Sequence, residues 1–411
     1  MRLKIASLAI VAGLSLVAVA ANASSAQKLD PGVTAKTIHI GGTFPFSGPA
    51  ALYAAIPTAE RAYFLYVNAH GGVNGRKIQF TYYDDAYDPS KTVPLTQKLV
   101  EQDKVFAVYG SLGTAPVLAT RGYLNSKKVP QVLVATGDSY WGTDTKKYPW
   151  TIGWQPDYPG EAKIYAKFIN DKVKQAKIGI LYQNDAYGQN YLNAFKAALS
   201  NQSQIVSAQS YDVTATSVTQ QVVALKAAGA NTFVIFATPS PTIQALVVAT
   251  KIGWHPIEFI NNVSATETFM GLAVKNGASV EGAITAGYVL DPNDPAQTKS
   301  PGSALGKKIL DTYDGGAPIF NTNNIYGLAS AWTFVQALKN AGNPPTRAGL
   351  MKALRTLNLK SNPWLYKGFV EKTGVGDGFP IEQLVLARYH SGGAAGIGYF
   401  GPFSRVYSNA R

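Results

Sequence analysis

Lys177-Ile-Gly-Ile-Leu-Tyr182 opens a stretch, residues 177–237, in which short apolar runs alternate with segments of helical period. The stretch closes on a second apolar run, Thr232-Phe-Val-Ile-Phe-Ala237. One face of the first helical segment, at positions i, i+3, i+4, i+7 and i+8, consists of Tyr191, Ala194, Phe195, Ala198 and Leu199. Strands and helices that alternate in this way predict a parallel sheet covered by helices on both faces.

The alternation occurs in two blocks, Thr37–Thr136 and Lys177–Val289. Between them lies Ser139–Gly160, a stretch with Trp, Pro and Gly that we interpret as a crossover between two lobes. The other expected strands are Thr37–Thr43, Lys77–Asp84, Phe106–Gly110, Gln131–Ala135, Ile205–Tyr211, Glu258–Asn261, Ala283–Val289 and Ile381–His390. Late helices are expected at Ser303–Tyr313, Ile325–Asn340 and Arg347–Thr356. The fold class is therefore α/β, with two doubly wound parallel-sheet lobes and a cleft that opens and closes.

Composition removes several classes of function. The 411 residues contain no cysteine, which excludes disulfide scaffolds, Cys-ligated metal sites and thiol nucleophiles. With 37 Lys plus Arg against 24 Asp plus Glu, the formal charge is +13, which invites a nucleic-acid partner. The late basic residues fall on the polar sides of helical patterns, however, without interleaved aromatics. We therefore interpret them as a solvated surface and expect no nucleic-acid binding.

The first residues predict export. Arg2 and Lys4 precede the uncharged apolar run Ile5–Ala21, and Ala21-Asn-Ala23 supplies the small-x-small pattern of a cleavage site. We expect a signal peptide, residues 1–23, cleaved after Ala23, and a periplasmic mature protein. An uncleaved membrane anchor is the alternative, because the run approaches the length needed to span a bilayer.

Several segments resemble the leucine/isoleucine/valine-binding protein family, the type I periplasmic substrate-binding proteins of branched-chain amino acid type ABC transporters. They occur in order along nearly the whole mature chain. They are Ile40-Gly-Gly-Thr-Phe-Pro-Phe-Ser-Gly-Pro49, Asn68-Ala-His-Gly-Gly-Val-Asn-Gly-Arg-Lys77, Val108-Tyr-Gly-Ser-Leu-Gly-Thr114 and Gly179-Ile-Leu-Tyr-Gln-Asn-Asp-Ala-Tyr-Gly188.

The resemblance implies the type I periplasmic-binding-protein fold, with three hinge crossings near Gln155, Val289 and Trp364. The implied N-terminal lobe is residues 24–155 plus 290–364, and the C-terminal lobe is 156–289 plus 365–411. The implied function is that of a monomeric receptor that closes over a small carboxylate ligand and delivers it to an ABC permease in the inner membrane. The ligand is a branched-chain or other amino acid, or an aromatic or aliphatic acid. The alternative is a ligand-sensing receptor of the same fold that regulates a partner protein.

A carboxylate cradle is expected where a strand ends and a helix begins. Thr114 precedes a helix whose N-terminus points at the carboxyl end of the sheet, so free N–H groups and the hydroxyls of Ser111 and Thr114 face that edge. From the residues alone, Thr114 is as well explained as a helix cap. The resemblance places the hydroxyl that binds the ligand carboxylate on Thr114. It places further contacts with the ligand head group on the segment Ala135-Thr136-Gly137.

Aromatic contacts are expected from both lobes. The resemblance places rings over the ligand at Tyr53 and Tyr187. Aromatic side chains suit this role because they bury a large apolar area with few rotatable bonds. Ordinary helix packing explains Tyr53 equally well. Trp141 lies near the first crossover, and we expect it to pack in the core or hinge.

One departure from the family pattern bears on the ligand. In amino-acid receptors of the family, an acidic residue after the strand matching Glu258–Asn261 pairs with the ligand ammonium. Here no acid occurs in that stretch before Glu267. Asn261, Asn262 and Ser264 are candidates to hydrogen-bond a neutral or hydroxylated group instead. This favours an acid without an ammonium group, while an inward-facing Glu267 keeps the amino-acid option open.

Signatures of catalysis are missing from the sequence. The four histidines are scattered singly, without a metal-binding pair, and neither a phosphate-binding loop nor a nucleophile elbow occurs. Gly392–Gly398 is glycine-rich but follows the last expected strand, so we interpret it as a turn. We expect no enzyme activity, catalytic residue, metal or cofactor.

Overall fold

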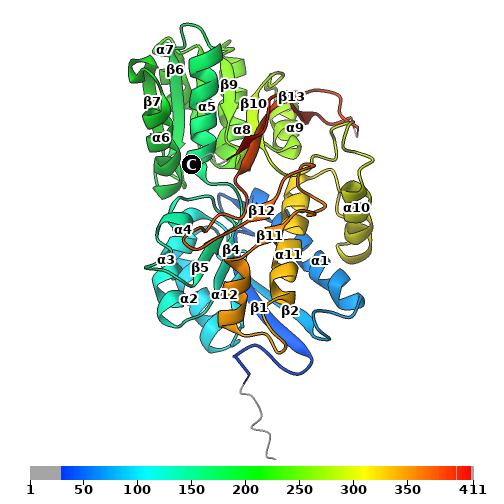
Figure 1. The fold of residues 1–411 in the computed structure, drawn as a ribbon. Coiled ribbons are helices and arrows are strands. Elements are labelled where there is room, and N and C mark those ends of the chain that lie inside the picture. Colours follow the sequence, from blue (N-terminus) through cyan, green and yellow to red (C-terminus); the bar gives the residue numbers. More distant parts are fainter. Residues whose placement is uncertain (1–28, 395, 409–411) are drawn as a thin grey trace, which may run out of the picture.

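The computed structural model describes residues 29–394 and 396–408, and the predicted signal peptide lies outside them. Figure 1 shows two lobes, one above the other, with several segments of the chain passing between them. Each lobe is built around its own sheet. The predicted α/β class with two parallel-sheet lobes is confirmed, and the fold is that of type I periplasmic binding proteins.

The first lobe contains a five-stranded parallel sheet in the order β2-β1-β3-β4-β5. Its strands are β1 (Thr37–Phe44), β2 (Lys77–Asp84), β3 (Ala107–Tyr109), β4 (Gln131–Val134) and β5 (Thr151–Gly153). Its helices are α1 (Ala55–Ala69), α2 (Pro89–Glu101), α3 (Thr114–Ser126), α4 (Tyr140–Thr143), α10 (Pro301–Tyr313), α11 (Thr322–Lys339) and α12 (Arg347–Leu354). Helix α1 packs against α10 and α11, and α2 packs against α3.

The second lobe contains a larger mixed sheet. Its parallel strands are β6 (Ile178–Gln183), β7 (Ile205–Tyr211), β8 (Thr232–Phe236), β9 (Ile257–Ile260) and β10 (Ile284–Gly287). Antiparallel strands complete it: β13 (Gln383–His390), β14 (Tyr399–Pro402) and β15 (Tyr407–Ser408). Its helices are α5 (Tyr158–Lys172), α6 (Ala186–Ala198), α7 (Thr219–Ala227), α8 (Pro239–Lys251) and α9 (Glu267–Lys275).

Aspartate caps begin several of the helices. Asp88 accepts a hydrogen bond from the N–H of Ser90 at the start of α2, and Asp185 accepts one from the N–H of Gly188 at the start of α6. These carboxylates satisfy N–H groups that have no partner inside the helix and also complement its dipole. Helices α2 and α6 therefore begin shortly after the strands that precede them, and the connecting loops lie at the carboxyl edge of each sheet.

The sequence pattern missed several short strands. Strand β5 lies within Ser139–Gly160, which we interpreted as a crossover only, and three residues are too few to show a period. Strand β14 begins directly after the glycine-rich turn segment. A two-stranded ribbon, β11 (Asn358–Leu359) with β12 (Glu371–Lys372), also had no signal.

Near the third crossing, which is expected at Trp364, the Trp364 carbonyl accepts a hydrogen bond from the N–H of Leu290, beside the second crossing. After Trp364, the carboxyl of Glu371 accepts a hydrogen bond from Trp154 Nε1 at 2.8 Å, and the carbonyl of Gly378 accepts one from Gly153. These contacts hold residues 371–378 against the end of β5 in the first lobe. The chain enters the second sheet only at Gln383. The crossings near Gln155, Val289 and Trp364 therefore remain our proposal, with residues 371–378 lying against the first lobe before the chain joins the second sheet.

Helices α1 and α11 approach each other closely at a glycine. A Cβ atom added to Gly327 would lie 2.5 Å from the carbonyl oxygen of Ile56 and 2.9 Å from Cβ of Ala59. Both distances are shorter than van der Waals contact, so only glycine permits this packing. Because both helices reach the cleft, their approach fixes part of its wall.

Replacing Gly327 with alanine is expected to lower the free energy of unfolding by about 1–3 kcal/mol, since the added methyl group forces the two backbones apart. Gly122, at an exposed position of α3, is the matched control because an added Cβ meets nothing within 4 Å. Gly122→Ala is expected to be neutral or to stabilise by up to about 1 kcal/mol, from helix propensity. Urea unfolding of both variants checks this; equal effects would contradict the packing argument.

Candidate functional site

A cavity lies between the two lobes, at the carboxyl ends of the strands of both sheets. It has about 890 Å³ of empty space, part of it open to solvent. Leu112 and Ala135 border it from the first sheet, and Thr238 and Gly287 border it from the second. This is where open α/β sheets bind ligands, because loops after the strands converge there.

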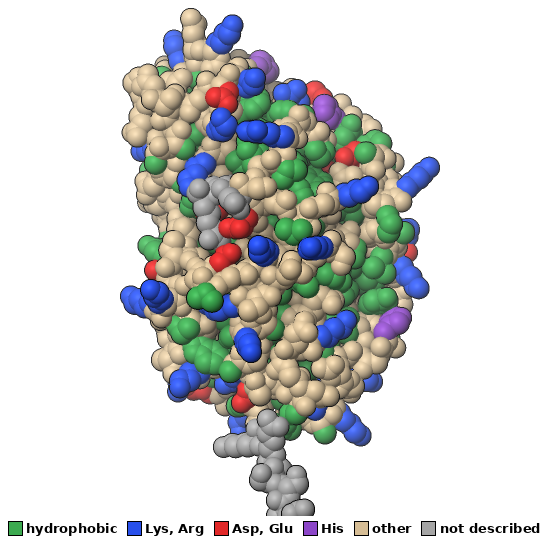
Figure 2. All heavy atoms as spheres, viewed as in Figure 1, with side chains coloured by type: hydrophobic (Ala, Val, Ile, Leu, Met, Phe, Trp, Pro, Cys, Tyr) green, Lys and Arg blue, Asp and Glu red, His purple; other side chains and the backbone are tan. Residues whose placement is uncertain are grey.

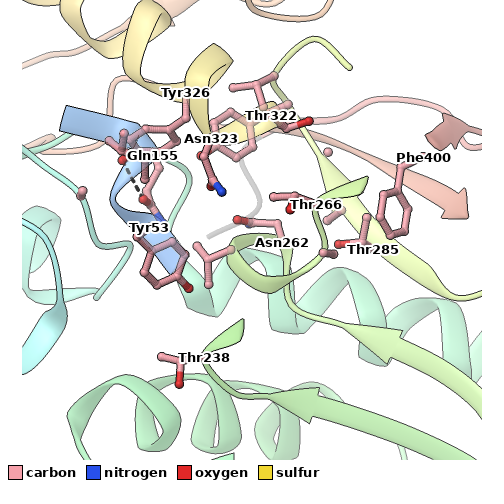
Figure 3. A pocket seen from close by; sticks show the side chains of 18 of the residues that line it. Tyr53, Gln155, Thr238, Asn262, Thr266, Thr285, Thr322, Asn323, Tyr326 and Phe400 are labelled. Atoms are coloured by element: carbon pink, nitrogen blue, oxygen red, sulfur yellow. Dashed lines mark hydrogen bonds between the residues drawn. The ribbon is translucent and has the colours of Figure 1, made fainter. Parts of the chain in front are cut away.

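Tyrosine dominates the cavity wall. The lining tyrosines are Tyr53, Tyr87, Tyr158, Tyr187, Tyr288, Tyr326 and Tyr366. They come from both lobes and from the segments between them, and Phe400 closes one side (Figure 3). Rings of this kind offer large apolar faces with few rotatable bonds, so the wall suits an apolar or aromatic ligand body.

The structure brings the two predicted aromatic contacts into this cavity. Tyr53 lies at its first-lobe side and Tyr187 at its second-lobe side. The Tyr187 hydroxyl donates to the carbonyl of Ala237 at 2.9 Å and accepts from Nδ2 of Asn261 at 2.6 Å. Its ring is therefore fixed, while its role toward a ligand remains a prediction.

The hydroxyl groups that were predicted to bind a ligand carboxylate are buried and do not line the cavity. Thr114 and Thr136 are buried, and their Oγ1 atoms are 2.6 Å apart in one hydrogen bond. The Ser111 hydroxyl accepts from the backbone N–H of Thr43 at 3.1 Å. None of these three residues lines the cavity, whereas Ala135 does. The strand end is thus correctly placed, but its hydroxyls bind protein groups.

Tyr158 explains why the cradle is covered. A Cβ atom on Gly137 would lie 2.7 Å from Cδ1 of Tyr158 and 2.5 Å from the carbonyl oxygen of Pro156. Burial raises the pKa of Tyr158, and hydrogen bonds to the Thr136 hydroxyl, the Gly137 N–H and the Thr114 hydroxyl oppose the rise. The phenol of Tyr158 therefore lies where the sequence predicted a ligand carboxylate, and Gly137 itself does not line the cavity.

A buried carboxyl orients Asn262. Glu161, in α5, accepts hydrogen bonds from both the backbone N–H and the side-chain Nδ2 of Asn262, and from the hydroxyls of Tyr165 and Tyr191. Burial raises the pKa of Glu161 to about 7, and these four donors oppose the rise. Because Nδ2 is engaged by Glu161, Asn262 keeps its Oδ1 for other partners at the cavity wall.

The neighbouring candidates have other partners. Ser264 donates to the carbonyl of Ala237 at 2.6 Å, and Asn261 bonds Tyr187 and the N–H of Ala237. Neither lines the cavity, so of the polar residues predicted in this loop only Asn262 does.

Two carboxyl groups also border the cavity. Glu267, the first residue of α9, accepts from the backbone N–H and the hydroxyl of Thr322, which begins α11. Asp291 accepts from the N–H groups of Asn293 and Phe400. Burial raises the pKa of both acids, and the charge of Asp291 raises that of Glu267 further. The pair Glu267–Thr322 is a hydrogen-bonded link between the two lobes.

Protonation of Glu267 contributes to stability at low pH. Its pKa is raised in the folded protein, so between the unfolded value near ~4.3 and the folded value only the folded protein holds the proton. The free energy of unfolding therefore falls as pH rises through this window, by up to about 1.4 kcal/mol per pH unit. Asp291 and Tyr389 are the titratable groups that act on Glu267, and Asp291 contributes in the same direction.

Glu267→Gln is expected to flatten this pH dependence, because the amide keeps the shape of the protonated acid and cannot ionise. Urea unfolding at pH 5, 7 and 9 measures the free energy of unfolding of both proteins. The stability of the variant relative to the natural protein should increase as pH rises. Glu101→Gln, an exposed acid on α2, is the control and should leave the slope unchanged. Equal slopes for Glu267→Gln and the natural protein would contradict the assignment.

Sequence reasoning missed Gln155, Tyr158, Asp291, Asn323 and Tyr326 at the cavity. These residues lie in crossings or at helix starts, where no hydrophobic period exists to indicate which way a side chain points. The only available signal was their position beside the predicted crossings. That position predicts which region of the chain borders the cavity but not which side chains face it.

The described residues contain no group of His, Asp or Glu arranged to hold a metal ion. Among them, no helix is long and apolar enough to cross a bilayer. Figure 2 shows Lys and Arg side chains dispersed over the visible face, with acidic side chains between them. This face carries the mixed charge of a solvated surface rather than a basic patch.

Residues 37–394 match the family described as periplasmic binding protein, and the chain belongs to this family. The resemblance to the leucine/isoleucine/valine-binding proteins is confirmed. The Leu/Ile/Val-binding protein of Escherichia coli K12 is 29% identical over 190 residues, which cover 40% of this chain and 44% of that protein. The Leu/Ile/Val-binding protein homolog 3 of Brucella melitensis is 27% identical over 39% of this chain and 44% of that protein. The chain thus matches less than half the length of these relatives.

Solved structures share the fold over nearly the whole chain. A branched-chain amino acid ABC transporter protein of Thermus thermophilus with bound valine has a TM-score of 0.79 at 18% identity, covering 92% of this chain and 97% of that one. A solute binding protein of Rhodopseudomonas palustris BisB5 in complex with 3,4-dihydroxy benzoic acid has a TM-score of 0.74 at 17% identity, covering 91% and 98%. A fatty acid ABC transporter substrate-binding protein of Thermomonospora curvata has a TM-score of 0.74 at 22% identity, covering 93% and 96%.

Proposed function

We propose that this chain is the periplasmic substrate-binding protein of an ABC importer, which closes two lobes over a small organic acid. It is exported by the predicted signal peptide, acts as a monomer without catalysis, and delivers its ligand to a permease in the inner membrane. The observation that carries the proposal is the interlobe cavity, because both lobes and the segments between them contribute to its wall.

Two contacts across the cleft support closure as the binding step. Glu267 of the second lobe accepts hydrogen bonds from Thr322 of the first. The N–H of Tyr158, at the start of the second lobe, donates to the carbonyl of Gly137 in the first at 2.7 Å. A ligand that binds the closed arrangement more tightly than the open one increases the fraction of protein molecules that are closed.

The cavity chemistry favours an acid with an aromatic or aliphatic body and without an ammonium group. Tyrosine is the most frequent residue type in its wall. Both Glu267 oxygens already accept from Thr322, and burial favours the protonated form of this acid. A buried ammonium needs an ionised partner, and the oxygens of Asp291, the other acid at the cavity, already accept from two backbone N–H groups, so such a site discriminates against amino acids. The related structures hold, by their own descriptions, valine in one case and a hydroxylated benzoate in another.

A thermal-shift panel tests the proposal. The mature protein, residues 24–411, is screened with 4-hydroxybenzoate, 3,4-dihydroxybenzoate, octanoate, L-leucine and L-valine. A compound at 100 times its Kd stabilises the folded protein by about 2.7 kcal/mol. We expect the aromatic or aliphatic acids to raise the Tm and the amino acids to do so less.

Stronger stabilisation by leucine or valine would contradict the ligand class but keep the transport function. No shift with any compound of the panel would contradict the proposed function. Small-angle scattering with and without the stabilising acid adds a readout of closure, since the radius of gyration should fall on binding. Chemical conversion of a bound compound would point to an enzyme, and a change in affinity for a partner protein would point to the sensing receptor.

A further inference from the structure

Two amide nitrogens at the cavity have no hydrogen-bond partner. They are Nε2 of Gln155 and Nδ2 of Asn323. Gln155 is 2% exposed and Asn323 is 4% exposed, and both line the cavity. A buried donor without an acceptor costs about 1–3 kcal/mol, so each of these nitrogens is a place where an acceptor on a ligand gains free energy.

The orientation of the Gln155 amide is fixed by Tyr326. The Tyr326 hydroxyl donates to Oε1 of Gln155 at 2.9 Å, as the dashed line in Figure 3 shows. The nitrogen of Gln155 is therefore turned away from Tyr326, and it presents a donor rather than an acceptor.

Asn323 lies in the first turn of α11, an 18-residue helix. Its backbone N–H donates to Oδ1 of Asn321, which caps the helix, so the backbone there is satisfied while the side-chain nitrogen is not. Figure 3 shows this nitrogen directed into the space between Gln155 and Asn262. The N-terminus of a helix carries partial positive charge, which favours a negative group at this position.

The side chains of the cavity wall indicate which chemical group of a ligand would bind these two nitrogens. Among the described residues, those that line the cavity include no Lys, Arg or His. Neutral N–H donors from separate elements of a cavity wall bind anionic oxygens through charge-assisted hydrogen bonds. Of the two acids at the cavity, Glu267 is favoured in its protonated form by burial, and the Asp291 carboxyl accepts hydrogen bonds from the N–H groups of Asn293 and Phe400, which offset its charge.

We propose that Gln155 Nε2 and Asn323 Nδ2 form the subsite for the ligand carboxylate, with the ligand body lying against the tyrosine wall. This assignment rests on the proposed function and deepens it. It moves the carboxylate from the end of β4, where Tyr158 covers the Thr114 and Thr136 hydroxyls, to the start of α11. Specificity for an acid over an uncharged analogue then comes from two amides on different segments.

Asn323→Asp and Gln155→Glu test the subsite, because each replaces the donor nitrogen by an oxygen of the same shape. Isothermal titration with 4-hydroxybenzoate and with 4-hydroxybenzyl alcohol compares an acid with its uncharged analogue. We expect each variant to weaken 4-hydroxybenzoate by about 10- to 100-fold, the loss of a hydrogen bond to a charged group. The alcohol should change by less than about threefold.

Asn340→Asp is the matched control, since it adds the same charge at the exposed C-terminal end of α11 and should not alter affinity. Thermal unfolding without ligand verifies that the variants fold, and the two test residues lie on different elements, so one variant suffices if the other fails to fold. Any other panel acid that the natural protein binds replaces 4-hydroxybenzoate as the probe.

Unchanged affinity for that acid in both Asn323→Asp and Gln155→Glu overturns the subsite and leaves the proposed function standing. A loss seen instead in Thr114→Val overturns it as well, because the carboxylate then lies at α3. If the natural protein binds no acid of the panel, the proposed function has already failed in the thermal-shift measurement, and the subsite falls with it.

Discussion

The parallel direction of the strands is the constraint on which the rest of this molecule depends. Within each lobe, successive helices return the chain to the same edge of the sheet, so β1, β3 and β4 of the first sheet all end on one side. The chain crosses between the sheets at those ends, which brings both carboxyl edges to one cleft. Many of the side chains at the cavity stand on loops, crossings or helix starts that this geometry places there.

The spacing of hydrophobic residues and the alternation of strand and helix segments along the chain allowed the two lobes to be predicted. Strands β2 and β7 have the predicted bounds. The packing of residues 371–378 against the first lobe could not be predicted, because it depends on contacts between residues far apart in the chain. Glu371 bonds Trp154 and Thr333, and no local pattern around residues 364–378 indicates that pairing. Short strands such as β5 failed for the opposite reason, since they are too brief to show any period.

The candidate site could be predicted as a region but only partly as side chains. A loop after a strand indicates which edge a residue occupies, and Tyr53, Ala135, Tyr187 and Asn262 do border the cavity. Whether a hydroxyl is free depends on its neighbours across the cleft. Thr114 is engaged by Thr136 and covered by Tyr158, a residue of the other lobe, so the sequence could not exclude it.

The packing of Tyr158 over Gly137 has an evolutionary consequence. Any side chain at position 137 would meet both the Tyr158 ring and the carbonyl of Pro156, so it is tolerated only after the loop at 156–158 has changed. Loss of the Tyr158 ring, in turn, uncovers the Thr114 and Thr136 hydroxyls and offers a second place for a ligand. The two positions are therefore epistatic: a change of specificity through this corner requires coordinated substitutions, and single steps are disfavoured.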